Sequence, residues 1–283
     1  KGLVHDTSAS GATLFIEPLA VLEENNKLRE LKIAESDEIE RILSALSEQT
    51  AAQGTTLVLD YRALTDLAAI FAKAEYSYSI NGMTPAINER DSTVKLVSAR
   101  HPLLDKSTVV PVTVTLGGKN SVLVITGPNT GGKTVALKTI GLFVLMNQSG
   151  IEIPCDYGSS LPIFDGVLPD IGDEQSIEQS LSTFSSHMVN IVSIIKQTTS
   201  KSLCLFDELG AGTDPTEGAA LAIAIIEEEK KKGAVIAATT HYAEIKQYAL
   251  ETDGVVNASC EFDVETLKPT YRLIVGLPGK SNA

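Results

Sequence analysis

The chain has 283 residues, of which 43% are apolar and 21% are charged, and its formal net charge is −13. This length allows one large or two modest domains. The composition is that of a globular protein, which excludes fibrous, collagen-like and disordered classes. Cys155, Cys204 and Cys260 stand far apart without CxxC spacing, so the sequence favours a reducing cytoplasm and argues against a zinc site.

No run reaches the roughly 18 apolar residues of a membrane span, and the first residues do not form a secretion signal, so we expect no membrane partner. The chain begins without Met and ends just after a glycine-rich turn, which indicates a piece of a longer polypeptide. Its acidic charge disfavours a broad nucleic-acid surface, because clustered Lys and Arg are needed to neutralise phosphates. DNA binding by this chain should therefore be weak and salt-sensitive.

The N-terminal part predicts a β-hairpin followed by helices. Two apolar runs flank Gly11, as in a hairpin, and His5 in the first run is expected to be structural. Over residues 17–53 apolar residues recur every three or four positions, which predicts a long amphipathic helix with Pro18 in its first turn. After a break, a second helical pattern stops before Asn81. The helices form either an antiparallel hairpin or a lever that connects a nucleotide site to a distal part.

After Pro85 short β-branched runs alternate with helical stretches. This alternation predicts an α/β fold with a buried, mostly parallel central sheet. We therefore expect two domains, a helical region over residues 1–85 and an α/β domain over residues 86–283. Strands are expected at residues 109–116, 122–126, 203–206 and 235–239.

The apolar run at residues 122–126 leads into the sequence GPNTGGKT, which a helical stretch follows. Strand, glycine-rich loop and helix in this order are typical of a P-loop NTPase, in which loop amides and the helix N-terminus bind phosphate oxygens. We expect Lys133 to reach the β- and γ-phosphates of ATP and the Thr134 hydroxyl to bind Mg²⁺. The residues expected to contact ATP or ADP are Gly127, Pro128, Asn129, Thr130, Gly131, Gly132, Lys133 and Thr134.

A second apolar run, residues 203–206, ends in two adjacent carboxylates. Because the chain turns at the end of a strand, both side chains can reach one site. Asp207 is expected to hold Mg²⁺ through its water shell, and Glu208 to orient and deprotonate the attacking water. Such a pair alone more often marks a turn, but its place downstream of a phosphate loop favours a catalytic site.

Two further segments carry candidate site residues. His241 follows the apolar run 235–239, and its place at the carboxyl edge of a third strand favours a γ-phosphate sensor over a structural histidine. Ser182 and Thr183 open a helical stretch, where either residue is a good N-cap. They could instead meet a phosphate in a second subunit, and the residues themselves leave both interpretations open.

Together these motifs resemble the MutS family, and the longer phrases GLVHDTSASGATLFIEP and DIGDEQSIEQSLSTFSSHM resemble its second bacterial paralogue, MutS-II. The resemblance covers essentially the whole chain. The motifs that carry it are GPNTGGKT, the RHP at residues 100–102, STFSSHM, LFDELGAGTDPTEG at residues 205–218 and ATTHY at residues 238–242.

The resemblance implies an ABC-type ATPase domain that follows lever and clamp-base helices, with two ATP sites shared across a homodimer. It implies that Asn129 contacts the γ-phosphate region, that Gln175 lies in a Q-loop-like segment, and that Ser182 and Thr183 act on the partner's nucleotide. Gly212, Thr213 and Asp214 then form a D-loop-like stretch.

The sequence departs from the family pattern in several places. This sequence contains no segment that resembles the C-terminal nuclease domain, the mismatch-reading domain or the helix-turn-helix that completes the dimer. We therefore expect endonuclease activity only in the full-length protein and weakened dimerisation of this chain. Val109 and Val110 stand where mismatch-repair relatives have a Phe that contacts adenine.

The first functional hypothesis is a Mg²⁺-dependent ATPase that couples dimer closure to movement of the lever. By resemblance, the intact protein acts on branched DNA, where it suppresses recombination, or on ribosomes. The alternative is a nucleotide-gated binding module with negligible turnover. A transporter ATPase is disfavoured because STFSSHM occupies the place of the LSGGQ phrase.

Overall fold

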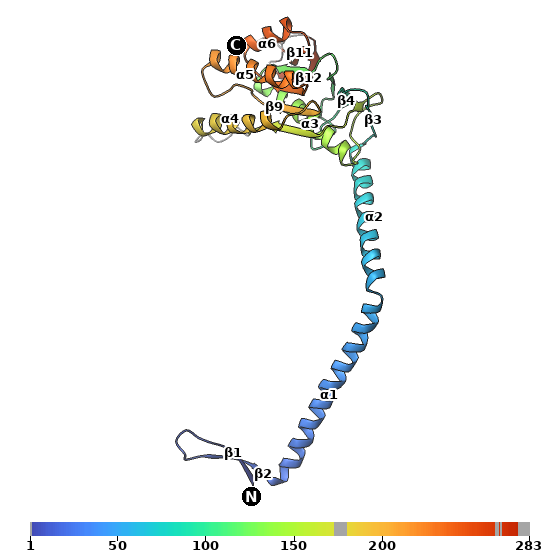
Figure 1. Ribbon diagram of the computed structural model, residues 1–283, viewed down its shortest axis with the longest axis vertical. Coiled ribbons are helices and arrows are strands. Elements are labelled where there is room, and N and C mark those ends of the chain that lie inside the picture. The colour runs from blue at the N-terminus through green and yellow to red at the C-terminus, as the bar shows by residue number, and fades with distance from the viewer. Residues whose placement is uncertain (1, 173–179, 264–265, 267, 277–283) are drawn as a thin grey trace. The chain divides into compact units, whose positions relative to one another are not determined.

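The computed structural model describes residues 2–172, 180–263, 266 and 268–276, without the side chains of Asn129 and of residues 180–183 (Figure 1). The chain forms two compact units, Lys1–Ala69 and Ile70–Ala283. The domain boundary expected after residue 85 stays a prediction. Among the described helices, none combines the length and apolarity needed to cross a membrane.

The first unit begins with the expected hairpin. Strands β1 (Gly2–Thr7) and β2 (Leu14–Pro18) pair antiparallel, with a bulge near His5. The His5 ring lies 2.5 Å from a carboxylate oxygen of Glu17 across the hairpin. Hydrogen bonds from Asn25 and from His5 hold the pKa of Glu17 below its usual value. The structural interpretation of His5 agrees with this contact.

Two helices follow, and they do not form the antiparallel hairpin weighed from the sequence. Helix α1 (Leu19–Ala52) starts just after Pro18, which occupies the N-cap position, and α2 spans Gly54–Ile80. Only Gln53 separates them, and its carbonyl still accepts the Leu57 amide at 2.9 Å. Reversal of the chain between antiparallel helices takes a loop of roughly two to five residues. The hairpin interpretation is therefore wrong, and no residue of α1 is buried.

The second unit contains a six-stranded sheet of order β12-β11-β6-β10-β9-β8. The neighbours from β8 to β11 run parallel, and only β12 is antiparallel. This confirms a mixed α/β fold. The strands are β6 (Val122–Thr126), β8 (Gly166–Asp170), β9 (Ser202–Phe206), β10 (Val235–Thr239), β11 (Val255–Asp263) and β12 (Lys268–Val275).

Alternate residues of the central strands enter two hydrophobic clusters, one on each face of this sheet. In β6, Leu123 and Ile125 pack in the cluster that contains α3 (Lys133–Gln148), whereas Val122 and Val124 face the other cluster. That second cluster includes residues of α4, α5 and α6. Their bounds are Ser180–Gln197, Pro215–Lys231 and Ala243–Glu251. Burial on both faces explains the continuous apolar runs.

A smaller four-stranded sheet has the order β3-β7-β4-β5. The strand expected at residues 109–116 lies here, outside the central sheet, and begins only at Val112. The reason is local, because the Val109 amide bonds to Asp105 in a turn and Pro111 has no amide to donate. The strands are β3 (Ala86–Ile87), β4 (Val94–Ala99), β5 (Val112–Leu116) and β7 (Ser160–Leu161).

Candidate nucleotide site

The glycine loop, residues 127–134, connects β6 to α3 at the carboxyl edge of the central sheet. A single 3₁₀ turn, Asn129–Gly131, is closed by the Gly131 amide, which donates to the Pro128 carbonyl at 2.9 Å. Gly132 then adopts a φ of +90°, a conformation that other residues rarely take, and α3 begins at Lys133. The loop therefore ends at a helix N-terminus, which attracts anions.

Cys260 of β11 packs closely against the glycine loop. A Cβ atom on Gly127 would lie 3.2 Å from the Cys260 carbonyl oxygen, and one on Gly131 would lie 3.0 Å from the Cys260 Cβ. A side chain at either position would crowd Cys260, and the φ of +133° at Gly127 further favours glycine there. Burial raises the pKa of the Cys260 thiol to about 11, so the loop rests on a neutral group.

Lys133 crosses the glycine loop as a buried cation, with only 1% of the residue exposed. Its Nζ donates to the Gly127 carbonyl at 2.8 Å. Burial lowers the pKa of Lys133, and the negative charges of Glu208 and Asp207 partly oppose that shift. A buried ammonium beside a glycine-rich loop and a helix N-terminus is suited to binding an anion.

In the acidic pair, Asp207 and Glu208, the first residue contacts the last residue of the glycine loop. Asp207 follows β9 and is buried, and the Thr134 hydroxyl donates to its Oδ1 at 3.2 Å. The two residues are 73 positions apart in the chain. A hydroxyl and a carboxylate at this distance fit a Mg²⁺ site completed by phosphate oxygens and water. Within the described part of the chain, no group of three or more His, Cys, Asp or Glu forms another candidate metal site.

Glu208 is half-buried and has a positive φ of +50°. Its amide donates to the Thr239 hydroxyl at 2.8 Å, and that hydroxyl donates to Asp207 Oδ1 at 2.5 Å. Sequence analysis did not single out Thr239. The available signal was a polar residue at the end of β10, one strand away from the acidic pair.

His241 lies two residues beyond the end of β10, at the same edge of the sheet, and is exposed. Its ring centroid is 4.4 Å from that of Tyr242. The buried Tyr242 hydroxyl donates to the Gly210 carbonyl at 3.0 Å and so joins this segment to the loop after the acidic pair. The role of His241 as a phosphate sensor stays a prediction.

The start of α4 differs from the capping interpretation. Ser182 and Thr183 have helical backbone inside α4, which is described from Ser180, whereas an N-cap residue lies outside the helix. Capping by these two residues is therefore wrong. Their side chains and Gln175 lie outside the described residues.

A buried carboxylate ties the first turns of α4 to the sheet. Asp170, at the end of β8, accepts hydrogen bonds from His187 at 2.9 Å and Asn190 at 2.8 Å. Its backbone carbonyl accepts the Asp207 amide at 2.9 Å. The position of α4 is thus linked to that of the acidic pair.

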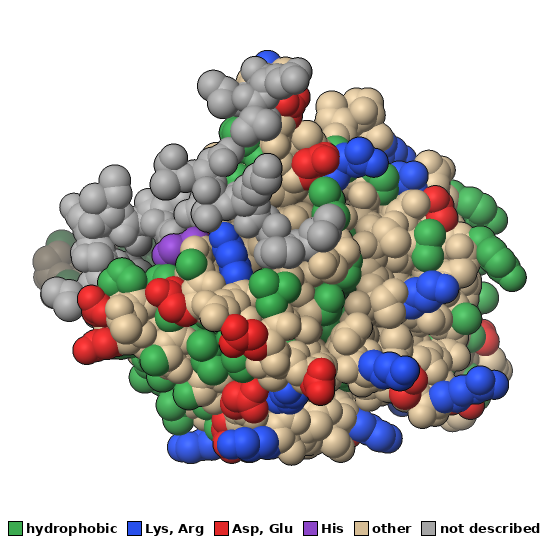
Figure 2. Space-filling model, turned by 90° about the horizontal axis from the view of Figure 1, so that it is seen from above, with side chains coloured by type: hydrophobic (Ala, Val, Ile, Leu, Met, Phe, Trp, Pro, Cys, Tyr) green, Lys and Arg blue, Asp and Glu red, His purple; other side chains and the backbone are tan. Residues whose placement is uncertain are grey.

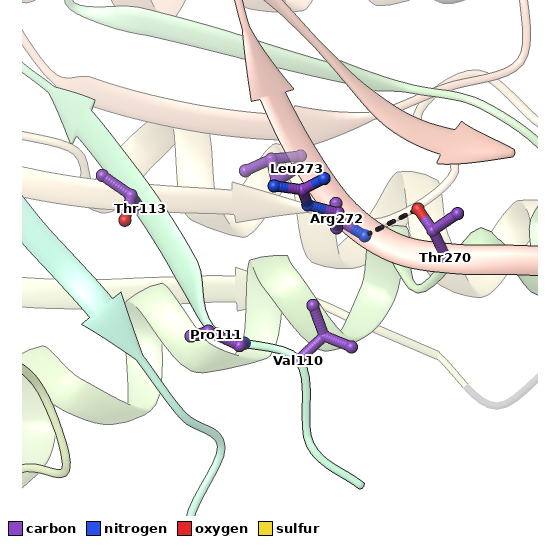
Figure 3. A pocket seen from close by; sticks show the side chains of 6 residues that line it. All are labelled: Val110, Pro111, Thr113, Thr270, Arg272 and Leu273. Carbon is purple, nitrogen blue, oxygen red and sulfur yellow. Dashed lines mark hydrogen bonds between the residues drawn. The ribbon is translucent and has the colours of Figure 1, made fainter.

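A pocket of about 410 Å³ opens between the segment leading into β5 and strand β12 (Figure 3). Beside it β12 bulges, and Tyr271 takes a φ of +59°. A Cβ atom on Gly132 would lie 3.2 Å from the Tyr271 ring. A bulge that re-aims a side chain is common beside functional sites. The pocket is lined by Val110, Pro111, Thr113, Thr270, Arg272 and Leu273.

Comparison with known proteins places these features in a family. The model of MutS domain V matches residues 123–281, more than half of the chain. Proteins named endonuclease MutS2 from Clostridioides difficile (strain 630), Agathobacter rectalis and Brevibacillus brevis are 58%, 59% and 57% identical over 282 residues. The matches cover 100% of this chain but only 36% of each relative. The chain therefore belongs to the MutS family and is of the MutS2 type.

Proposed function

We propose that this chain is a Mg²⁺-dependent ATPase of the P-loop, ABC-type class, with its nucleotide site at the carboxyl edge of the central sheet. The observation that carries the proposal is the 3.2 Å contact between Thr134 and Asp207, because it unites a phosphate-binding loop with a metal-binding carboxylate. Membership of the MutS family and the match to MutS domain V support it.

Each residue has a distinct role in this proposal. The amides of the glycine loop bind phosphate oxygens, and Lys133 neutralises charge on the β- and γ-phosphates. Thr134 and Asp207 hold Mg²⁺, which shields the phosphate charge when it is bound. Glu208 orients the attacking water and accepts its proton, and His241 contacts the γ-phosphate. Asn129 and Gln175 contribute further phosphate contacts by family likeness.

The base of the nucleotide is proposed to lie beside Tyr271 of β12. The side chain of Tyr271 adjoins the glycine loop, and the neighbouring residues Thr270 and Arg272 line the pocket. An aromatic ring here supplies the stacking surface that Val109 and Val110 do not.

Replacement of Tyr271 by alanine is therefore expected to weaken ATP binding about 5- to 150-fold, since stacking of a base on an aromatic ring contributes roughly 1–3 kcal/mol. Binding of inorganic triphosphate should not change. Calorimetric titration of both ligands measures the difference. Tyr157→Ala, which alters a tyrosine that is 93% exposed, is the matched control. An equal loss for both ligands would place Tyr271 outside the base site.

In the full-length protein we propose that ATP closes a homodimer across this site, with Ser182 and Thr183 acting on the partner's nucleotide, and that closure moves α1 and α2 as a lever. The relatives are named endonucleases. We assign strand cleavage to other parts of such a protein, since this chain covers 36% of each of these relatives. Branched DNA or the ribosome is the proposed partner of the full-length protein. The face in Figure 2 carries acidic and basic side chains intermixed, and it shows no broad basic surface for DNA phosphates.

The direct test is Mg²⁺-dependent phosphate release by the chain, combined with sedimentation with and without a non-hydrolysable ATP analogue. The ATPase proposal requires release above buffer background and a larger assembly with the analogue. Tight nucleotide binding without release would instead support the nucleotide-gated binding module. Absence of both binding and release would overturn both functions.

A further inference from the structure

One hydroxyl group contacts both members of the acidic pair. Thr239 is the last residue of β10, and none of it is exposed. Its Oγ1 donates to Asp207 Oδ1 at 2.5 Å and accepts the Glu208 amide at 2.8 Å. Its backbone carbonyl also accepts the Leu209 amide at 3.1 Å. Three successive residues of the neighbouring strand end are thus held by one residue of β10.

The roles in these bonds are fixed by chemistry. A threonine hydroxyl has one hydrogen and two lone pairs. The carboxylate of Asp207 can only accept, so the hydrogen points to it, and a lone pair receives the amide of Glu208. Because threonine is branched at Cβ, its side chain has few rotamers, and the hydroxyl is held in place.

The backbone conformation of Glu208 depends on its hydrogen bond to Thr239. A φ of +50° is unfavourable for a residue with a Cβ and persists only where the surroundings enforce it. The bond to Thr239 is one such constraint. Its loss would let the backbone of Glu208 relax and carry the carboxylate away from the glycine loop.

We propose that Thr239 is a positioning residue that sets the geometry of the acidic pair without touching the nucleotide itself. The proposal rests on the ATPase function above, in which Asp207 holds Mg²⁺ and Glu208 activates water. Through a single oxygen Thr239 fixes the rotamer of the first carboxylate and the backbone of the second. The positions of Asp207 and Glu208 therefore both depend on the end of β10.

The test compares Thr239→Val, which keeps the shape but removes both bonds, with Thr239→Ser, which restores the hydroxyl. Thr139→Val is the matched control, since Thr139 is also buried and its hydroxyl bonds to the Val135 carbonyl within α3. The readouts are amide hydrogen exchange at Glu208, ATP affinity with and without Mg²⁺, and kcat.

In Thr239→Val, exchange at Glu208 should rise about tenfold or more because its amide loses its partner. ATP affinity without Mg²⁺ should stay within about twofold, while kcat falls about 10- to 1,000-fold, as for a misplaced catalytic group. Thr239→Ser and Thr139→Val should stay near wild type in all three readouts.

Wild-type exchange and kcat in Thr239→Val would overturn the proposal, and so would an equal loss in Thr139→Val. The exchange readout separates this proposal from the ATPase function. If the wild-type chain releases no phosphate, the ATPase function fails, whereas unchanged exchange at Glu208 in Thr239→Val shows that Thr239 does not hold that residue.

Discussion

Replacement of Lys133 by alanine is expected to lower the affinity of the chain for ATP at least about a hundredfold, which corresponds to roughly 2.7 kcal/mol. The Lys133 ammonium is almost fully buried beneath the glycine loop, where water screens its charge poorly. Isothermal titration with ATP measures the loss.

The same substitution should change the stability of the fold only modestly, because removal of a buried ammonium offsets the loss of its packing and of its bond to the Gly127 carbonyl. Burial of an ammonium costs free energy, and the lowered pKa of Lys133 reflects that cost. Thermal unfolding without nucleotide is the measurement. Lys138→Ala is the matched control, because Lys138 lies on the same helix but is exposed. If Lys133→Ala bound ATP within threefold of the wild-type affinity, the glycine loop would not be part of the nucleotide site.

Replacement of Glu208 by glutamine should reduce kcat about 100- to 10,000-fold, the usual contribution of a general base. The amide side chain keeps the size of the carboxylate but cannot accept a proton from water. The backbone bond from residue 208 to Thr239 is retained, so ATP affinity should stay within about threefold of wild type. Single-turnover phosphate release measures the rate, and equilibrium titration measures the affinity.

Glu244→Gln is the control for this change, since it removes an exposed carboxylate at the start of the nearby α6. It should hydrolyse ATP at the wild-type rate. If kcat were the same in Glu208→Gln and in wild type, another group would be the general base. Parallel losses of ATP affinity and of kcat would indicate damage to the fold.

The sequence predicted the central sheet well where burial dominates. Strands β6 and β10 begin and end at the predicted residues because both faces are covered and every position is apolar or small. The glycine loop was also readable, since its order of strand, loop and helix is local. The long helices were found as well, but an apolar stripe indicates only that a helix has a partner and not which one. The antiparallel pairing of α1 with α2 was therefore wrong.

The contacts that sequence analysis missed all depend on which strands become neighbours. Thr239 reaches the acidic pair because β10 lies beside β9, and Cys260 supports the glycine loop because β11 pairs with β6. Tyr271 meets Gly132 through a bulge in β12. Thr239 lies in the ATTHY motif, whereas Cys260 and Tyr271 lie in none of the motifs, but the contacts of all three follow only from the order of the sheet.

The support of the glycine loop by β11 has a consequence for synthesis of the protein. The Thr126 hydroxyl bonds to the Ala258 carbonyl across 132 positions of sequence, and Cys260 lies two residues further on. When a ribosome has just completed α3, the glycine loop has therefore been synthesised but the strand that supports it has not. Since chains emerge from the N-terminal end, we expect the nascent polypeptide to bind nucleotide only after β11 has been translated and has paired with β6. Premature termination before β11 should yield fragments that contain the complete GPNTGGKT motif but do not bind ATP.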